Sequence, residues 1–453
     1  MSEAMERFRE KNRWVACVGI VLIVLSVALG GYRAIKKYQT PGPFSHDNAG
    51  FCDFHNGLYF PTVALIEGIS PYGEVYASSY PVDRQVPFFS PAFFVLHIPL
   101  AMLPLRIAEA IFFLLIVATT LAIGYVVTLM IGRPKRWDLI LLITGLLLCS
   151  RGGQSTLYVG YFTMEIVLAT LLAIRWGDRK PWLAALALVV VSAKPTYILP
   201  LGFLLLARGN LKALVLGAVL SVMAAAIPFT WLAANASDEG LLAGFSQIVT
   251  DIRDTQDVHM LVFDEMPVHT WTRIDTPAIV AKWMEADPSQ AKLVGIMFFV
   301  LAVPMLVLFR RARAGVDDGA AGLTGLVILS TFLASLYHQS YDAMVLIAPL
   351  MGVVVGNPAI WRNGCGAIGK PTRIAVAALI VIPVYSFFST RILLGRLDPD
   401  PIALKLLASI SGISIALLVV VSCSLAWRLE LGMPSVATRQ DEPSNDESGN
   451  NLA

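Results

Sequence analysis

An aspartate and a histidine lie among aromatic residues in the stretch FCDFHNGLYF, residues 51–60. The acid is Asp53 and the histidine is His55, with Tyr59 close behind and Tyr72 further along the same segment. A carboxylate in such surroundings can act as a general base, because partial burial raises its affinity for a proton. Two alternatives stay open at this point: the aromatics can be anchors at a membrane interface, and the acid can be an ordinary solvated residue.

Two cationic residues interrupt apolar segments further along the chain. Arg151 opens the sequence RGGQ, which ends at Gln154 between two apolar runs. Arginine and turn amides suit an anion such as phosphate, although a tight turn with a snorkelling arginine fits the same pattern. Lys194 precedes a proline within the apolar segment 182–207, where a lysine is a functional hypothesis by default. The alternative is a turn lysine that reaches the lipid headgroups.

A third polar group, the sequence HQSYD, joins two apolar runs with almost no loop between them. It begins at His338 and ends with Tyr341 and Asp342. These side chains must lie at the edge of the bilayer, where buried polar groups require hydrogen-bond partners. A structural hydrogen-bond cluster and a contact to substrate explain the pattern equally well.

The composition indicates which elements position these groups. The chain has 453 residues, of which 56% are hydrophobic and 15% charged, against about 25% charged residues in soluble domains. Apolar segments of about twenty residues recur along almost the whole chain, which predicts an all-α polytopic integral membrane protein. A net charge of +2 without a basic run gives no sign of nucleic-acid binding, and the five cysteines show no metal or disulfide spacing. We therefore expect no metal and no cofactor.

The distribution of lysine and arginine predicts about twelve transmembrane helices in a plasma membrane, with both chain termini in the cytoplasm. Residues 1–13 are then a cytoplasmic N-terminus, residues 14–427 a single transmembrane domain, and residues 428–453 a disordered cytoplasmic tail. Two long outer loops are expected at 36–89 and 233–291. All six histidines fall on or near the outer face, which places the chemistry on that side.

Three segments depart from simple membrane spans. Residues 90–105 are short and contain three prolines, so we expect a re-entrant or interfacial segment on the outer side. The segment 182–207 is expected to form two short helices that meet near Lys194. In the second outer loop, apolar residues at helical spacing between Leu242 and Ile252 predict an amphipathic helix on the outer membrane surface.

The sequence GCGAIGK, residues 364–370, matches the glycine pattern of nucleotide-binding loops. It follows an apolar helix rather than a strand, and Pro371 replaces the serine or threonine that would reach magnesium. We therefore expect a flexible cytoplasmic turn here rather than a nucleotide site.

Several short motifs occur in a defined order between residues 50 and 350. They are Asp-hydrophobic-His at Asp53–His55, Gly-x-Ser-Pro-Tyr at Gly68–Tyr72, Pro-Leu-Ala-Met-Leu-Pro at Pro99–Pro104, Gly153-Gln154, Lys194-Pro195 and His338-x-x-Tyr-Asp. This order resembles the GT-C glycosyltransferases of the polyprenol-phosphate-mannose-dependent mannosyltransferase type, glycosyltransferase family 87. Family members usually place a tyrosine closer to the loop aspartate than Tyr59 is to Asp53, which leaves Asp47 as an alternative base.

The resemblance implies a GT-C-like fold and a membrane hexosyltransferase. The sugar, mannose in the first instance, would pass from a polyprenyl-phosphate donor to a lipid or glycan acceptor on the outer face, without a metal. Asp53 would be the general base, and Lys194, Arg151 and His338 would stabilise the phosphate leaving group. The remaining substrate-binding candidates are His55, Tyr59, Tyr72, Gln154, Tyr341 and Asp342.

The main alternative is a polytopic transporter without transferase activity. A transporter would place polar groups near the bilayer midplane, at the interface between internal repeats. In this chain the charges collect on one face and no repeat is evident. Arabinose or glucose in place of mannose, and a lipid-linked glycan ligase, are alternatives among enzymes.

Overall fold

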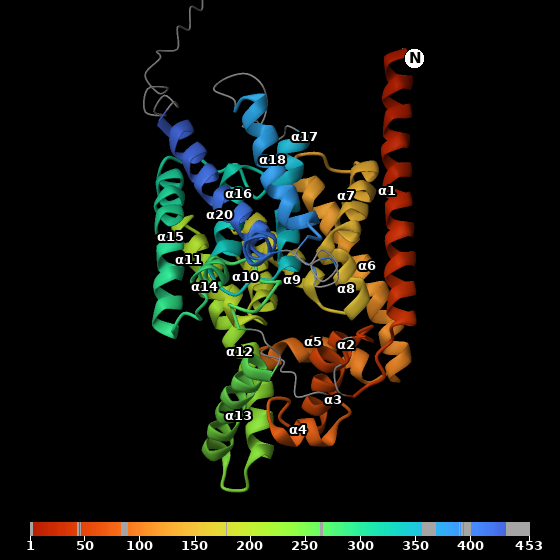
Figure 1. The fold of residues 1–453 in the computed structure, drawn as a ribbon, viewed down its shortest axis with the longest axis vertical. Helices are drawn as coiled ribbons and strands as arrows, with labels where there is room; N and C mark the ends of the chain where they lie inside the picture. Colours follow the sequence, from red (N-terminus) through yellow and green to blue (C-terminus); the bar gives the residue numbers. More distant parts are fainter. Residues whose placement is uncertain are drawn as a thin grey trace, which may run out of the picture.

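A computed structural model of the protein describes residues 3–42, 45, 47–82, 89–177, 179–262, 266–355, 368–388, 390, 393 and 400–431. His46, residues 364–367 of the glycine-rich sequence and the tail beyond residue 431 lie outside the described residues. Within the described ranges the regular secondary structure is helical, apart from two isolated β-bridges. Figure 1 shows an elongated bundle with a smaller group of short helices at one end.

The N-terminal part of the chain, helices α1 to α5, forms one side of the bundle and the group of short helices at its end. The long helix α1 (Glu3–Lys36) lies beside α7 and leads away from the chain terminus to the short helices (Figure 1). The short helices are α2 (Cys52–Phe54), the π-helical turn η1 (His55–Tyr59), α3 (Phe60–Glu67), α4 (Glu74–Ser79) and α5 (Pro91–Ala101).

The central part of the chain returns to the bundle. Its helices are α6 (Leu105–Met130), α7 (Trp137–Cys149), α8 (Arg151–Val159), α9 (Thr163–Trp176), α10 (Pro181–Val191), α11 (Pro195–Ala207), α12 (Leu211–Ala236) and α13 (Leu241–Val262). Helix α13 folds back on α12 and extends beyond the bundle beside the short helices (Figure 1). The predicted helix between Leu242 and Ile252 is therefore confirmed, while its place on a membrane surface stays a prediction.

The C-terminal part supplies the rest of the bundle. Its helices are α14 (Thr276–Met284), α15 (Gln290–Arg313), α16 (Leu323–Ser335), the 3₁₀-helical turn η2 (Ser340–Leu346), α17 (Ile347–Val355), α18 (Lys370–Tyr385) and α20 (Pro401–Leu431). Every residue of α16 is buried, as expected for a helix that is apolar on all sides and surrounded by other helices. It packs against α11, α15 and α20.

The apolar helices show that the protein is a polytopic membrane protein. Five helices of the described chain are long and apolar enough to cross a membrane: residues 12–36 of α1, then α6, α12, α15 and residues 401–428 of α20. Helices α7 and α8 make a sixth if the pair, bent by 71°, counts as one span. Several other apolar helices are shorter, among them α5, α10, α11 and α16.

The break at Lys194 has the form that the sequence predicts. Helix α10 ends at Val191 and α11 begins at Pro195, with Lys194 in an extended conformation between them. A proline cannot continue the preceding helix, because it lacks a backbone donor and restricts the residue before it. The carbonyl of Ala193, which lies in this break, accepts a hydrogen bond of 3.0 Å from the backbone N–H of Ser90, and this bond attaches the start of α5 to the break.

The RGGQ sequence forms the first turn of helix α8. It is not the tight turn that was one of the two predictions from the sequence. Ser150 is extended, and its hydroxyl accepts the backbone N–H of Gly153 at 3.0 Å, so that it caps α8. The bend brings Gly153 against α7: a Cβ at Gly153 would lie 2.1 Å from the Leu147 carbonyl oxygen. The bend thus requires glycine, and it sets the direction in which Arg151 points.

We predict that Gly153→Ala destabilises the protein by about 1–3 kcal/mol, because the new methyl group overlaps the backbone of α7. The matched control is Gly295→Ala in α15, where a Cβ meets nothing within 4 Å and alanine favours the helix. Thermal unfolding of the purified protein in detergent compares the two. Equal melting temperatures for Gly153→Ala and wild type would contradict the close approach.

Candidate active site

Asp53 lies on α2, which is held against the end of α8. Phe51, directly before α2, has a left-handed backbone (φ 62°), and its N–H donates to the carbonyl of Tyr158 at 2.9 Å. Gly160, which ends α8, has φ +74°, and a Cβ there would lie 2.7 Å from the Cβ of Phe54. The two backbones therefore approach closely, and the sequence FCDF is fixed beside the connection between α8 and α9.

The carboxyl group of Asp53 is partly buried and electrostatically tuned. Burial raises its pKa to about 6, because a carboxylate that leaves water is harder to ionise. The thiol of Cys52, 3.5 Å from Oδ1, and the positive charge of Lys194 offset part of this rise. A carboxyl group with this pKa is mostly ionised at neutral pH and is still a stronger base than an exposed aspartate.

Lys194 is the buried cation of the site. Its ammonium nitrogen lies 3.8 Å from Oδ1 of Asp342 and 3.5 Å from the hydroxyl of Tyr197. The nitrogen also lies 4.8 Å from the ring centres of Tyr161 and Tyr197 and 5.0 Å from that of Tyr341. A carboxylate and aromatic faces thus stabilise the charge. The contacts join the α10–α11 break, the α8–α9 connection and η2.

Asp342 also forms a buried pair with His338, whose ring packs against Tyr197. Oδ2 of Asp342 lies 3.3 Å from Nδ1 of His338 and accepts the backbone N–H of Gln339 at 2.9 Å. The imidazole is fully buried, with its centre 4.6 Å from the ring of Tyr197 and 4.2 Å from that of Phe332. Its Nε2 has no hydrogen-bond partner in the described part of the chain. A buried nitrogen of this kind is available to a ligand.

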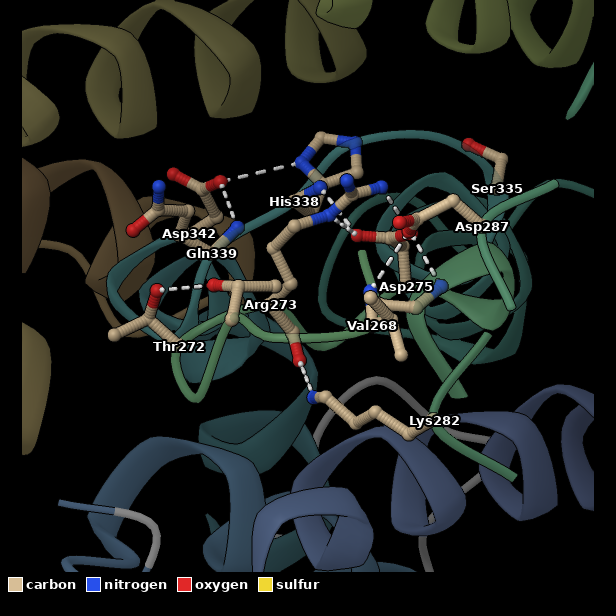
Figure 2. Close-up of polar contacts among 12 residues, drawn as sticks. Val268, Thr272, Arg273, Asp275, Lys282, Asp287, Ser335, His338, Gln339 and Asp342 are labelled. Carbon is tan, nitrogen blue, oxygen red and sulfur yellow. Dashed lines mark hydrogen bonds and ion pairs between the residues drawn. The ribbon is translucent and has the colours of Figure 1, made fainter. Parts of the chain in front are cut away.

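An arginine–aspartate pair from a distant segment fixes His338 from below (Figure 2). Asp275 accepts two hydrogen bonds from the guanidinium of Arg273, at 2.9 and 2.8 Å. It also accepts the backbone N–H of His338 at 3.1 Å, and that of Ala278 at 3.1 Å as the cap of α14. Burial alone would raise the pKa of Asp275, but the charge and hydrogen bonds of Arg273 lower it overall.

The backbones of the two segments are paired as well. The N–H of Ile274 donates to the carbonyl of His338 at 2.8 Å, and the N–H of Ser340 donates to that of Thr272 at 2.8 Å. Arg273 and Gln339 form the antiparallel bridge between them. The start of η2, which carries Asp342, is therefore positioned by the loop before α14.

Another buried cation, Lys282, lies on the far side of this network. Its ammonium donates to the carbonyls of Arg273 and Ala408, both at 3.4 Å. Burial lowers the pKa of Lys282 to about 8; Asp275 opposes this shift, and the nearby charges of Arg273 and Arg151 add to it. Arg151 itself is buried and donates to the carbonyl of Ser386 at 3.4 Å. Arg151 therefore points toward α18 and Lys282.

Four other candidate residues are hydrogen-bonded to the scaffold. Nε2 of His55 lies 2.7 Å from Oε1 of Glu109 on α6, a carboxylate that also accepts from Tyr38. The remaining bonds are Tyr59 to the carbonyl of Leu103, Tyr72 to that of Phe89, and Gln154 to those of Ser26 and Leu148. The structure does not bring these polar groups to Lys194, and their substrate roles stay predictions. The alternative base Asp47 is exposed.

Sequence reasoning missed Arg273, Asp275, Lys282 and Glu109. The sequence Asp275-Thr-Pro does contain a signal, because an acid just before a proline is typical of a helix start. That signal predicts the cap of α14 but not the contact to His338. Within the described residues, no group of three or more histidine, cysteine, aspartate or glutamate side chains is arranged to hold a metal ion.

The fold and this cluster define a polytopic membrane protein with a buried polar site of acids, a histidine and a lysine. The family model of Glycosyltransferase family 87 matches residues 88–335, more than half of the chain. The protein therefore belongs to glycosyltransferase family 87 and is a membrane glycosyltransferase, an enzyme that acts on a sugar donor and an acceptor. The resemblance seen in the sequence is confirmed. No curated protein and no solved structure matches the chain.

The matched range contains part of the site only. Arg151, Lys194 and Asp275 lie inside it, whereas Asp53 and His338 lie before and after it. The family match therefore establishes that the protein is a glycosyltransferase. Any role of Asp53 or His338 has to be argued from the positions of their side chains in the structure.

We predict that Asp275→Asn lowers the free energy of unfolding by about 3–5 kcal/mol at pH 7, because it leaves the buried Arg273 without its carboxylate. Asparagine can still cap α14, so the loss of unfolding free energy measures the effect of removing the negative charge of Asp275. Since the pKa of Asp275 is lowered in the folded protein, wild type keeps this contribution at neutral pH and loses it only in acid.

Glu285→Gln is the matched control for this variant. Glu285 is exposed and forms an ion pair with Lys405, and an exposed pair contributes little to stability. Thermal melts in detergent should show a large shift for Asp275→Asn and no measurable shift for Glu285→Gln. Similar shifts for the two variants would refute the positioning role of Asp275.

Proposed function

We propose that the enzyme transfers a hexosyl group, mannose in the first instance, from a polyprenyl-phosphate donor to a hydroxyl of a lipid or glycan acceptor. Asp53 takes the proton of the acceptor hydroxyl, and the acceptor oxygen forms a bond to the anomeric carbon. The bond between that carbon and the phosphate oxygen breaks, and polyprenyl phosphate leaves with the electron pair. The observation that carries this proposal is the buried ammonium of Lys194, which lies beside Asp342 and Tyr197 and whose charge acts on Asp53.

The charged groups of the site suit both requirements of this reaction, which are removal of a proton from the acceptor hydroxyl and stabilisation of the leaving phosphate. A general base needs a pKa near the working pH, and burial gives Asp53 a pKa of about 6. The leaving phosphate gains negative charge, which fixed cations and donors stabilise. Lys194 and the free Nε2 of His338 are the candidates nearest to Tyr197, and Arg151 is a third candidate on the α18 side.

Tyr161, Tyr341 and the aromatic residues around Asp53 offer faces on which sugar rings can pack. We also propose that Tyr59, Tyr72, His55 and Gln154 contact the substrate, with hydrogen bonds to the scaffold that hold their side chains in place. The apolar helices provide surfaces for a polyprenyl chain, which accounts for an enzyme of this kind being a membrane protein.

The proposal includes a GT-C-like arrangement of about twelve transmembrane helices, with the site on the outer face of a plasma membrane. The start of α1 lies at the end of the molecule opposite to α2–α5 (Figure 1). The last turn of α15 carries Arg310, Arg311 and Arg313. Basic residues of this kind are typical of the cytoplasmic side, which supports a cytoplasmic N-terminus and an outward-facing Asp53.

The first test supplies purified wild type and Asp53→Asn in nanodiscs with polyprenyl-phosphate mannose, arabinose and glucose. We expect wild type to release polyprenyl phosphate fastest from the mannose donor, and Asp53→Asn to be slower by about 10²–10⁴-fold, the usual contribution of a general base. Asp47→Asn is the control, because Asp47 is exposed. Loss of activity in Asp47→Asn alone would assign the base to Asp47 instead.

The pH dependence tests the same assignment independently. A base acts in its ionised form, so the rate should rise with pH through about 6 and level off above it. Because the folded protein holds the Asp53 proton more tightly than the unfolded chain, ionised Asp53 destabilises the fold by up to about 3 kcal/mol at higher pH. Asp53→Asn should therefore melt at or above the wild-type temperature at pH 7.5. A lower melting temperature would mean that lost activity reflects unfolding.

A further inference from the structure

A polar pocket of about 310 Å³ lies at the end of the molecule away from Asp53. Helix α11 starts next to Lys194 and ends at Ala207, a rise of about 20 Å, and Arg208 at its end lines this pocket. Two more arginines, Arg179 and Arg311, line it together with Asp317 and Thr324. The pocket therefore has no part in the site around Asp53.

Arg311 is the most deeply buried of the three pocket arginines. Only 1% of the residue is exposed, although it lies in the last turn of α15. Its Nε donates to the hydroxyl of Thr324 at 3.2 Å, and its Nη2 lies 3.2 Å from Oδ2 of Asp318. Nη1 has no hydrogen-bond partner among the residues that the structure describes, and Nη2 has the ion pair with Asp318 but no hydrogen bond. Buried donors without acceptors are costly, and a guanidinium presents them in the geometry that fits a phosphate.

The neighbouring carboxylates leave the pocket positive. Asp317 lies 2.6 Å from Nη2 of Arg208. Asp318 accepts the backbone N–H groups of Leu323 and Thr324, at 2.9 and 2.7 Å, so its oxygens cap α16. Three guanidinium groups thus face two carboxylates that already have partners, and the excess of positive charge favours an anion.

We propose that this pocket binds the phosphodiester headgroup of an anionic phospholipid. It lies at the end of α15, a helix of membrane-spanning length, where headgroups meet the protein. Large apolar side chains close to these arginines in the sequence are exposed: Leu206 and Leu211 before and after Arg208, and Phe309 two residues before Arg311. These surfaces suit acyl chains, which a free phosphate ion lacks. Basic pockets between membrane helices are known to hold anionic headgroups.

The test measures binding of phosphatidylglycerol to the delipidated full-length protein in detergent by native mass spectrometry. Phosphatidylcholine is the neutral comparison, and inorganic phosphate is the competitor that lacks acyl chains. We expect one bound phosphatidylglycerol, and binding about fivefold weaker for each arginine removed in Arg311→Gln and Arg179→Gln. Arg133→Gln, an exposed arginine outside the pocket, should bind within twofold of wild type.

Arg179 is exposed, so Arg179→Gln keeps the test valid if Arg311→Gln does not fold. Equal binding of phosphatidylcholine and phosphatidylglycerol would overturn the proposal, as would unchanged binding in both pocket variants. Displacement of the lipid by inorganic phosphate at an equal concentration would assign the pocket to a free anion instead. Activity of Asp53→Asn has no bearing on this result, because the assay follows binding alone.

Discussion

The buried charge of Lys194 is the constraint on which the site depends. A cation among apolar helices is stable only if nearby groups replace the water that it has lost. Asp342, Tyr197 and the rings of Tyr161 and Tyr341 do this, and they come from three different parts of the chain. Stabilising one ammonium group thus brings η2, the α8–α9 connection and the α10–α11 break together, and the same charge acts on Asp53.

A second set of contacts keeps η2 in place. Asp342 lies in a short 3₁₀ turn, whose hydrogen-bond geometry is poorer than that of an α-helix, and His338 lies two residues before this turn. The loop before α14 supplies the missing support through Asp275 and the backbone pairing at Arg273. Because Asp275 also caps α14, the orientation of His338 and the position of that helix depend on one carboxylate. Polar groups that support a site in this way restrict its geometry.

The two ends of the protein use charge differently. At the Asp53 end, acids and cations are interleaved with aromatic rings; burial raises the pKa of Asp53, and one ring nitrogen of His55 and one of His338 have no hydrogen-bond partner among the described residues. At the other end, arginines outnumber their carboxylate partners around a pocket beside exposed apolar side chains. The first arrangement suits a reaction in which a proton and a phosphate move apart. The second suits attachment to a negatively charged membrane surface.

The amino-acid sequence alone predicts the class of the protein and several of its elements. Composition and apolar run length indicate a helical membrane protein, proline places the break at Lys194, and helical spacing predicts the helix that became α13, because each of these depends on local chain physics. Only the tertiary structure joined Asp275 to His338 across 63 residues and turned His55 toward Glu109 across 54. Local patterns carry no information about which distant polar groups meet, since burial and packing of the whole bundle select those partners.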